Sequence, residues 1–151
     1  MKLEELMIGD WVKYLGRQWR VIDIATTSHY PITLGEDYFE KCDDNGTRFL
    51  NKQEIEQVDP IQITSELLYQ NGIELVDIGD NGPSTPPKHR NRYEKWFIHT
   101  KWKDTHLWFD RTTKKYHLSN MGEAKIEYVH ELQHVLRLCG IDLDVNVLKL
   151  Q

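Results

Sequence analysis

Short runs in which apolar and polar residues alternate fill the first third of the chain. They predict β-strands over residues 11–14, 19–25, 38–42 and 47–50, because side chains two positions apart lie on the same face of a strand. Asn45-Gly46 predicts a tight hairpin between the last two strands, since both residues tolerate positive φ angles. Several short strands with close turns are typical of small closed sheets. We therefore expect an SH3-like β-barrel over residues 1–58.

Residues 59–151 predict a second module. Asp59-Pro60 ends the first pattern, because proline interrupts regular structure. A short helix is expected next. Thr64 or Ser65 can cap its first turn with a side-chain oxygen, and Gly72 can end it in a left-handed conformation.

Alternation returns further along this module. It predicts strands over residues 73–78, 93–102, 106–111 and 115–118, and the last three form an antiparallel meander. Residues 79–92 hold three prolines and two glycines, which predict an irregular loop. Loops of this kind connect elements or bind ligands.

The last helix is expected over residues 123–139, with Gly140 at its stop position. At 100° per residue its apolar side chains fall within one stripe, which should pack on the sheet. The stripe consists of Tyr128, Val129, Leu132, Val135, Leu136 and Cys139. His130 and His134 lie on the opposite side and should face solvent, and an edge strand is expected over residues 144–150. The fold class that follows is α+β, mostly β.

Composition narrows the classes of protein that the chain can belong to. Its 39% of hydrophobic residues is too many for a disordered chain, and its two cysteines exclude a disulfide framework. No run approaches the roughly 20 apolar residues of a membrane span, and the charged start lacks the apolar core of a signal peptide. We expect a cytoplasmic protein that has no membrane association and no cofactor.

Charge is unevenly spread along the chain. The net charge is −5, yet residues 88–120 carry nine basic and three acidic side chains. Seven of the sixteen aromatic residues lie in the same range. The acidic balance argues against a general polyanion-binding protein, while this basic, aromatic range permits local binding of an anion.

One face of the predicted meander combines aromatic and basic residues. The candidate binding residues are Lys95, Phe97, His99, Lys101 and Trp108, with Arg90 and Arg92 in the preceding loop. Aromatic rings beside positive charges bind single-stranded nucleic acid by base stacking. The same patch suits a protein partner. A third interpretation is that both faces of the sheet are covered, since aromatic residues in strands usually lie in the core.

Residues 130–134, His-Glu-Leu-Gln-His, match the His-Glu-x-x-His signature of zinc metalloproteases. Two histidines four positions apart on a helix can bind one zinc ion, and Glu131 would act as the base. A catalytic zinc needs a third protein ligand, but Asp142 and Asp144 are the only carboxylates downstream. We therefore interpret the match as coincidental, with metal binding by His130 and His134 as an alternative, and we expect no enzyme.

Three stretches resemble a group of small uncharacterised proteins encoded by phages, prophages and mobile elements of Bacteroides-type gut bacteria. They are LEELMIGDWV at residues 3–12, PIQITSELL at 60–68 and IEYVHELQH at 126–134. The resemblance implies a small accessory protein and transfers no catalytic residue.

The sequence thus predicts a non-enzymatic accessory or binding protein that acts by protein–protein interaction. Binding of single-stranded nucleic acid through residues 88–120 is the alternative. Zinc-dependent hydrolysis through His130 and His134 is a third hypothesis.

Overall fold

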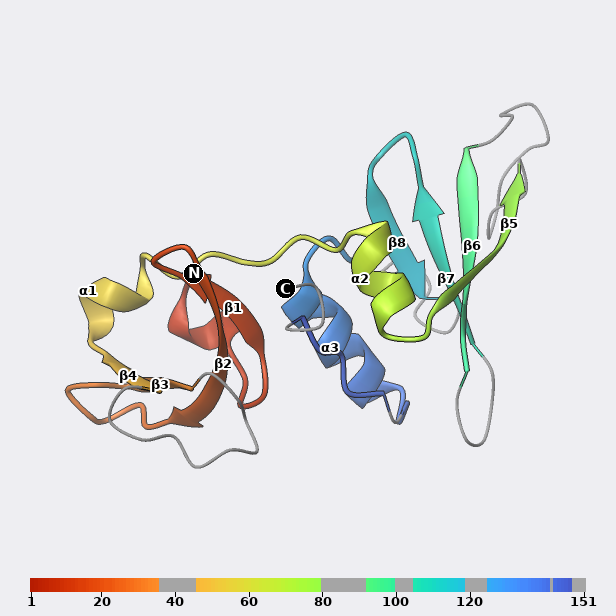
Figure 1. Ribbon diagram of the computed structural model, residues 1–151. Coiled ribbons are helices and arrows are strands. Elements are labelled where there is room, and N and C mark those ends of the chain that lie inside the picture. The colour runs from red at the N-terminus through yellow and green to blue at the C-terminus, as the bar shows by residue number, and fades with distance from the viewer. Residues whose placement is uncertain (36–45, 80–91, 100–104, 119–124, 142, 148–151) are drawn as a thin grey trace. The chain divides into compact units, whose positions relative to one another are not determined.

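The computed structural model divides the chain into two compact units, residues 1–62 and 63–151. It describes residues 1–35, 46–79, 92–99, 105–118, 125–141 and 143–147. Each unit contains a four-stranded antiparallel sheet and short helices (Figure 1). The predicted class, α+β and mostly β, is confirmed.

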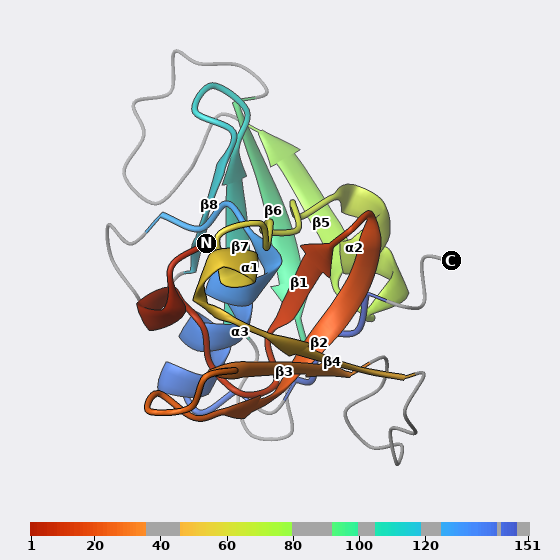
Figure 2. The same ribbon diagram turned by 90° about the vertical axis from the view of Figure 1, so that its left-hand side faces the viewer.

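The first unit is built on the strand order β1-β2-β3-β4 (Figure 2). Its elements are η1 (Leu3–Glu5), β1 (Trp11–Tyr14), β2 (Arg17–Ile24), β3 (Ile32–Gly35), β4 (Thr47–Leu50) and α1 (Lys52–Ile55). Its core is formed by Leu6, Val12, Tyr14, Trp19, Val21, Ile32, Leu34, Leu50, Ile55 and Val58. Over the described residues these strands form an open sheet and not a closed barrel.

β3 is a strand that the sequence pattern did not predict. All four of its residues are buried, and it pairs with β2 on one side and β4 on the other. Pro31 directly precedes it, at a position where the missing amide removes no bond from the ladder. The predicted strand over residues 38–42 lies outside the described residues, and β4 pairs with β3.

The first unit extends past the expected end at residue 58. The Asp59 amide donates to the Lys13 carbonyl at 2.8 Å, and the Lys13 amide donates to the Asp59 carbonyl at 2.9 Å. Because these bonds tie Asp59 to β1, the residue belongs with the first sheet and not with the second module.

The second unit is built on the strand order β5-β6-β7-β8. Its elements are α2 (Ser65–Gln70), β5 (Glu74–Gly79), β6 (Tyr93–Ile98), β7 (Thr105–Asp110), β8 (Lys115–Leu118) and α3 (Val129–Leu138). The predicted three-stranded meander is therefore extended by β5, which pairs with β6. The sheet strands lie side by side in Figure 1 and Figure 2.

The signals that predicted α2 are confirmed. The Leu67 amide donates to the Thr64 hydroxyl oxygen at 3.2 Å, which caps the first turn. Gly72 follows the helix with a φ angle of 77°, a conformation that residues with a Cβ atom rarely adopt.

One face of the second sheet is apolar and buried. It consists of Trp96, Ile98, Leu107, Tyr116 and Leu118. Tyr69 of α2 meets Trp96 of β6 edge to face, with ring centroids 5.1 Å apart. The aliphatic and aromatic side chains of this face therefore form the core side of the sheet, with α2 against it.

The last helix is shorter than predicted. It begins at Val129, because Ile126 pairs in extended conformation with Tyr116, with N–O distances of 2.6 and 2.7 Å. The edge strand predicted over residues 144–150 is wrong for residues 144–147, which adopt no strand. Residues 119–124 and 148–151 lie outside the described part.

A buried asparagine connects α2 to the segment after α3. The Asn71 side-chain amide donates to the Leu67 carbonyl at 2.9 Å and to the Asn146 carbonyl at 3.0 Å. Its oxygen accepts from the Asn146 amide at 2.8 Å. Since the side chain meets all these partners in a buried position, it joins two segments that lie far apart in the sequence.

We expect Asn71→Ala to lower the free energy of unfolding of the second unit by about 2–4 kcal/mol, because it removes three hydrogen bonds between a buried side chain and the backbone of Leu67 and Asn146. Urea denaturation followed by tryptophan fluorescence measures this loss. A change below about 0.5 kcal/mol would contradict the structural role of this side chain.

Candidate functional site

The face of the second sheet opposite its core gathers aromatic, histidine and lysine side chains. Lys95 lies opposite Trp108, and Phe97 lies opposite His106. Trp108 also lies opposite His117 on its other side. Directly opposed residues of an antiparallel pair project from the same face. We call this set the ring face: Lys95, Phe97, His99, His106, Trp108 and His117.

Rings of this face form a connected row. The centroid of Phe97 lies 4.7 Å from that of His99 and 5.0 Å from that of His106. The His106 and Trp108 centroids are 6.5 Å apart, and Lys95 Nζ lies 5.4 Å from the centroid of Trp108. His99 is exposed and the other members are half-buried, so their rings are accessible in part.

The sequence analysis named four members of this face and missed two. Lys95, Phe97, His99 and Trp108 are brought together as predicted. His106 alternates with Trp108 along β7, a signal already present in the sequence. His117 could be placed only through its pairing with Trp108. Of the three other candidates, Arg90 and Lys101 lie outside the described residues and Arg92 lies within them.

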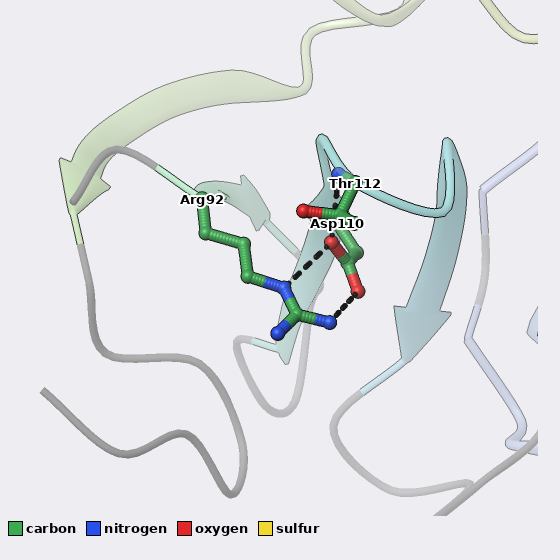
Figure 3. A network of polar contacts seen from close by, with 3 residues as sticks. All are labelled: Arg92, Asp110 and Thr112. Carbon is green, nitrogen blue, oxygen red and sulfur yellow. Dashed lines mark hydrogen bonds and ion pairs between the residues drawn. The ribbon is translucent and has the colours of Figure 1, made fainter. Parts of the chain in front are cut away.

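Arg92 forms an ion pair with Asp110. Its Nε and Nη2 atoms donate to Oδ1 and Oδ2 of Asp110, each at 3.0 Å (Figure 3). Asp110 Oδ1 also accepts from the Thr112 amide at 2.9 Å. The guanidinium is thus held at the end of the sheet in a two-pronged ion pair, and its role in binding stays a prediction.

The same network shifts the pKa values of both partners. Burial favours a higher pKa for Asp110, but the hydrogen bonds from Arg92 and from two backbone amides outweigh it, and the pKa lies below 3.8. The hydrogen bond to Asp110 raises the pKa of Arg92 against the opposing effect of desolvation. Both side chains are therefore charged at neutral pH.

Two further cations of the second unit are paired with carboxylates. Arg111 Nε and Nη2 lie 3.0 and 2.9 Å from Glu94 Oε2. Lys115 forms an ion pair with Glu127, which raises the pKa of the lysine. Three of the five described cations between residues 92 and 118 are thus held in such pairs. The positive charge counted in the sequence is largely compensated over this described part.

His117 adds little positive charge at neutral pH. Burial lowers its pKa below 6.5; the Asp110 carboxylate opposes the shift and Lys125 adds to it. The imidazole is therefore neutral at pH 7. The ring face thus combines an aromatic surface with few net charges.

The His-Glu-x-x-His segment lies at the start of α3 and differs from its predicted placement. His130 is buried and stacks on Tyr128, with ring centroids 6.0 Å apart, so its expected exposure to solvent is wrong. Tyr128 directly precedes the helix as its N-cap residue. His134 is half-buried, with its ring centroid 5.7 Å from that of His130.

Glu131 has a local structural role. Its Oε1 atom accepts hydrogen bonds from the backbone amides of Tyr128 at 3.0 Å and Glu127 at 3.2 Å. These bonds fix the start of α3 in the manner of a capping box. Within the described ranges, no three His, Cys, Asp or Glu side chains are grouped so that they could hold a metal ion.

We expect Asp110→Asn to lower the free energy of unfolding at pH 7 by about 1–3 kcal/mol, since it removes a charge-assisted pair. Because the folded pKa of Asp110 is depressed, its stabilisation is complete above pH 3.8 and is lost as the pH falls through the folded value. Unfolding measured from pH 7 to pH 2 should therefore be less pH-dependent in the variant. Asp23→Asn, at an exposed aspartate, is the control and should keep the wild-type profile. Identical profiles for the wild type and Asp110→Asn would contradict the role of the pair.

Comparison with known proteins found no matching family model, no matching curated protein and no matching solved structure. None of the helices in the described part is long and apolar enough to span a membrane.

Proposed function

We propose that this protein is a non-enzymatic binding protein whose second unit contacts a partner protein through the ring face. One observation carries the proposal: Phe97 and Trp108 are half-exposed on one sheet face and linked by the ring of His106. Large aromatic residues, tryptophan above all, dominate the binding energy of protein interfaces. A rigid sheet holds these rings in place without an ordering cost on binding.

The charges around the ring face also favour a protein partner. The centre of a protein interface is depleted of unpaired charge. Arg92 and Lys115 are paired with carboxylates, so part of the positive charge beside the rings is compensated. A polyanion gains most of its affinity from unpaired cations. This compensation therefore supports a protein ligand over a nucleic acid.

Binding of single-stranded nucleic acid is the second candidate, and one contact favours it. The Lys95 ammonium lies beside the Trp108 ring, which combines a stacking surface with a positive charge. Lys101 and Arg90 would add to that charge by their place in the sequence.

Two further parts of the proposal concern the biological role of the protein and the fold relationship of its first unit. The resemblance to phage, prophage and mobile-element proteins supports an accessory role inside a bacterial host. Four short antiparallel strands in the first unit support an SH3-like relationship for that unit. Both belong to the proposal.

We expect the double variant Phe97→Ser, Trp108→Ser to lose partner binding while remaining folded, because both side chains are accessible on the sheet face. Affinity capture from host cells, followed by direct titration of the captured partner, measures the loss. Leu138→Ser is the control, since Leu138 is an exposed apolar residue at the end of α3. A partner that binds the double variant as tightly as the wild type would contradict the proposal. Capture of no specific partner would also contradict it.

Titration with a fluorescent oligothymidine separates the two candidates. For a protein-binding surface we expect no saturable binding at about 50 mM salt, where phosphate contacts are strong. Saturable binding that weakens steeply towards about 200 mM salt, and that Lys95→Ala and Trp108→Ser remove, would instead establish nucleic-acid binding.

A further inference from the structure

Asn71 is followed by Gly72, and Asn-Gly is the dipeptide in which asparagine most readily loses its side-chain amide. The nitrogen of the following residue attacks the side-chain carbonyl carbon, and glycine has no Cβ atom to hinder that attack. The same dipeptide occurs at residues 45–46 and 81–82. Of the three asparagines, the one at position 71 lies in the described part of the structure, so its surroundings show what controls the reaction there.

The backbone of Asn71 keeps the reacting atoms apart in the folded protein. The residue follows α2 with a φ angle of −99° and a ψ angle of 12°. At this ψ angle the Gly72 nitrogen lies on the side of the Asn71 amide nitrogen, whereas ring closure needs it on the side of the Cβ atom. The Gly72 amide also donates to the Tyr69 carbonyl at 3.1 Å, which holds the proton that the attacking nitrogen must lose. Attack therefore requires that this turn first opens.

The side chain of Asn71 is fixed as well. Its three hydrogen bonds to the backbone of Leu67 and Asn146 engage both the nitrogen that would leave and the oxygen of the carbonyl under attack. The two neighbours of Asn146, Val145 and Val147, are fully buried. Separating residues 143–147 from α2 breaks these hydrogen bonds and disturbs the packing of both valines, so the open state is rare.

We propose that Asn71 is a site of spontaneous deamidation whose rate is set by the opening of its contact with Asn146. In the open state the deprotonated Gly72 nitrogen attacks Cγ of Asn71. The new C–N bond closes a succinimide, the bond from Cγ to Nδ2 breaks, and ammonia leaves with the proton that the Gly72 nitrogen has lost. Water then adds to either carbonyl of the ring, which gives aspartate or isoaspartate at position 71. Water is the one reactant consumed, and no oxidant or reductant takes part.

The product cannot restore the contact. A carboxylate at position 71 has no proton to donate, yet it would face the Leu67 and Asn146 carbonyl oxygens that now accept from the amide. Acceptors opposite a buried carboxylate repel it. Isoaspartate lengthens the backbone before Gly72, so it also changes the turn. Deamidation is therefore a one-way change that loosens residues 143–147 from α2. Position 71 lies outside the ring face, so the reaction is independent of the proposed partner.

Peptide mapping by mass spectrometry measures the reaction in the full chain, kept in mildly alkaline buffer with or without guanidinium chloride. In the native protein we expect deamidation at position 71 to be about ten to a hundred times slower than in the denatured chain, since local opening limits it. Equal rates in the two samples would overturn the proposal. Absence of product in a native sample kept for about a hundred half-lives of the denatured reaction would also overturn it.

Val145→Ala tests the control by opening. It leaves the Asn-Gly dipeptide intact but removes buried contacts beside Asn146. Position 71 should therefore react at least about threefold faster in the native variant and at the wild-type rate in guanidinium chloride. Val76→Ala, at a valine of β5 that is 51% exposed, is the control and should react as the wild type does. An unchanged native rate in Val145→Ala would overturn the proposed role of opening.

Asn71→Asp reproduces one of the products and tests the structural consequence. Hydrogen–deuterium exchange followed by mass spectrometry should be at least about tenfold faster in residues 143–147 of this variant than in the wild type. Exchange at the wild-type rate would show that the carboxylate keeps the contact and would overturn the one-way release.

Discussion

The antiparallel register of β6, β7 and β8 is the constraint on which the second unit depends. Side chains alternate between the two faces of a sheet, so a slip of one residue would exchange the faces. With Trp96 and Leu107 in the core, such a slip would bury Lys95 and His106 in their place. The register that satisfies the core therefore also assembles the opposite face. The position of Trp108 between Lys95 and His117 is a consequence of burying the apolar face.

Several cations of the second sheet are paired with carboxylates. Asp110 lies at the end of β7, where it holds Arg92 with two hydrogen bonds and accepts from the amide of Thr112. Glu94 holds Arg111 through one carboxylate oxygen on the other face of the sheet. These carboxylates are few in the local sequence, yet each meets a cation directly. Over the described residues, these ion pairs thus compensate part of the positive charge that composition gives this sheet.

The first unit combines a strained hairpin turn with exposed apolar side chains. A hairpin turn with two positive φ angles is most stable with residues that tolerate them, but the chain has leucine at the first position. Leu15, Tyr30 and Phe49 also leave apolar surface in water beside an edge strand. Strain at Leu15 and exposed apolar side chains therefore occur together at the groove that β4 lines.

Local signals in the sequence were sufficient for several elements. These elements depend on residues only a few positions away, and the structure has them as predicted. They are the strands at residues 11–14, 47–50 and 115–118, the helix cap at Thr64 and the helix end at Gly72. Alternation also placed Lys95, Phe97 and Trp108 on a common face.

Other features were decided by tertiary structure alone. They are the pairing of β3 with β4, the ion pair that neutralises the charge of Arg92, the burial of His130 and the groove along β4. Each depends on contacts between residues far apart in the chain. The periodicity of a sequence does not show which distant segments come into contact.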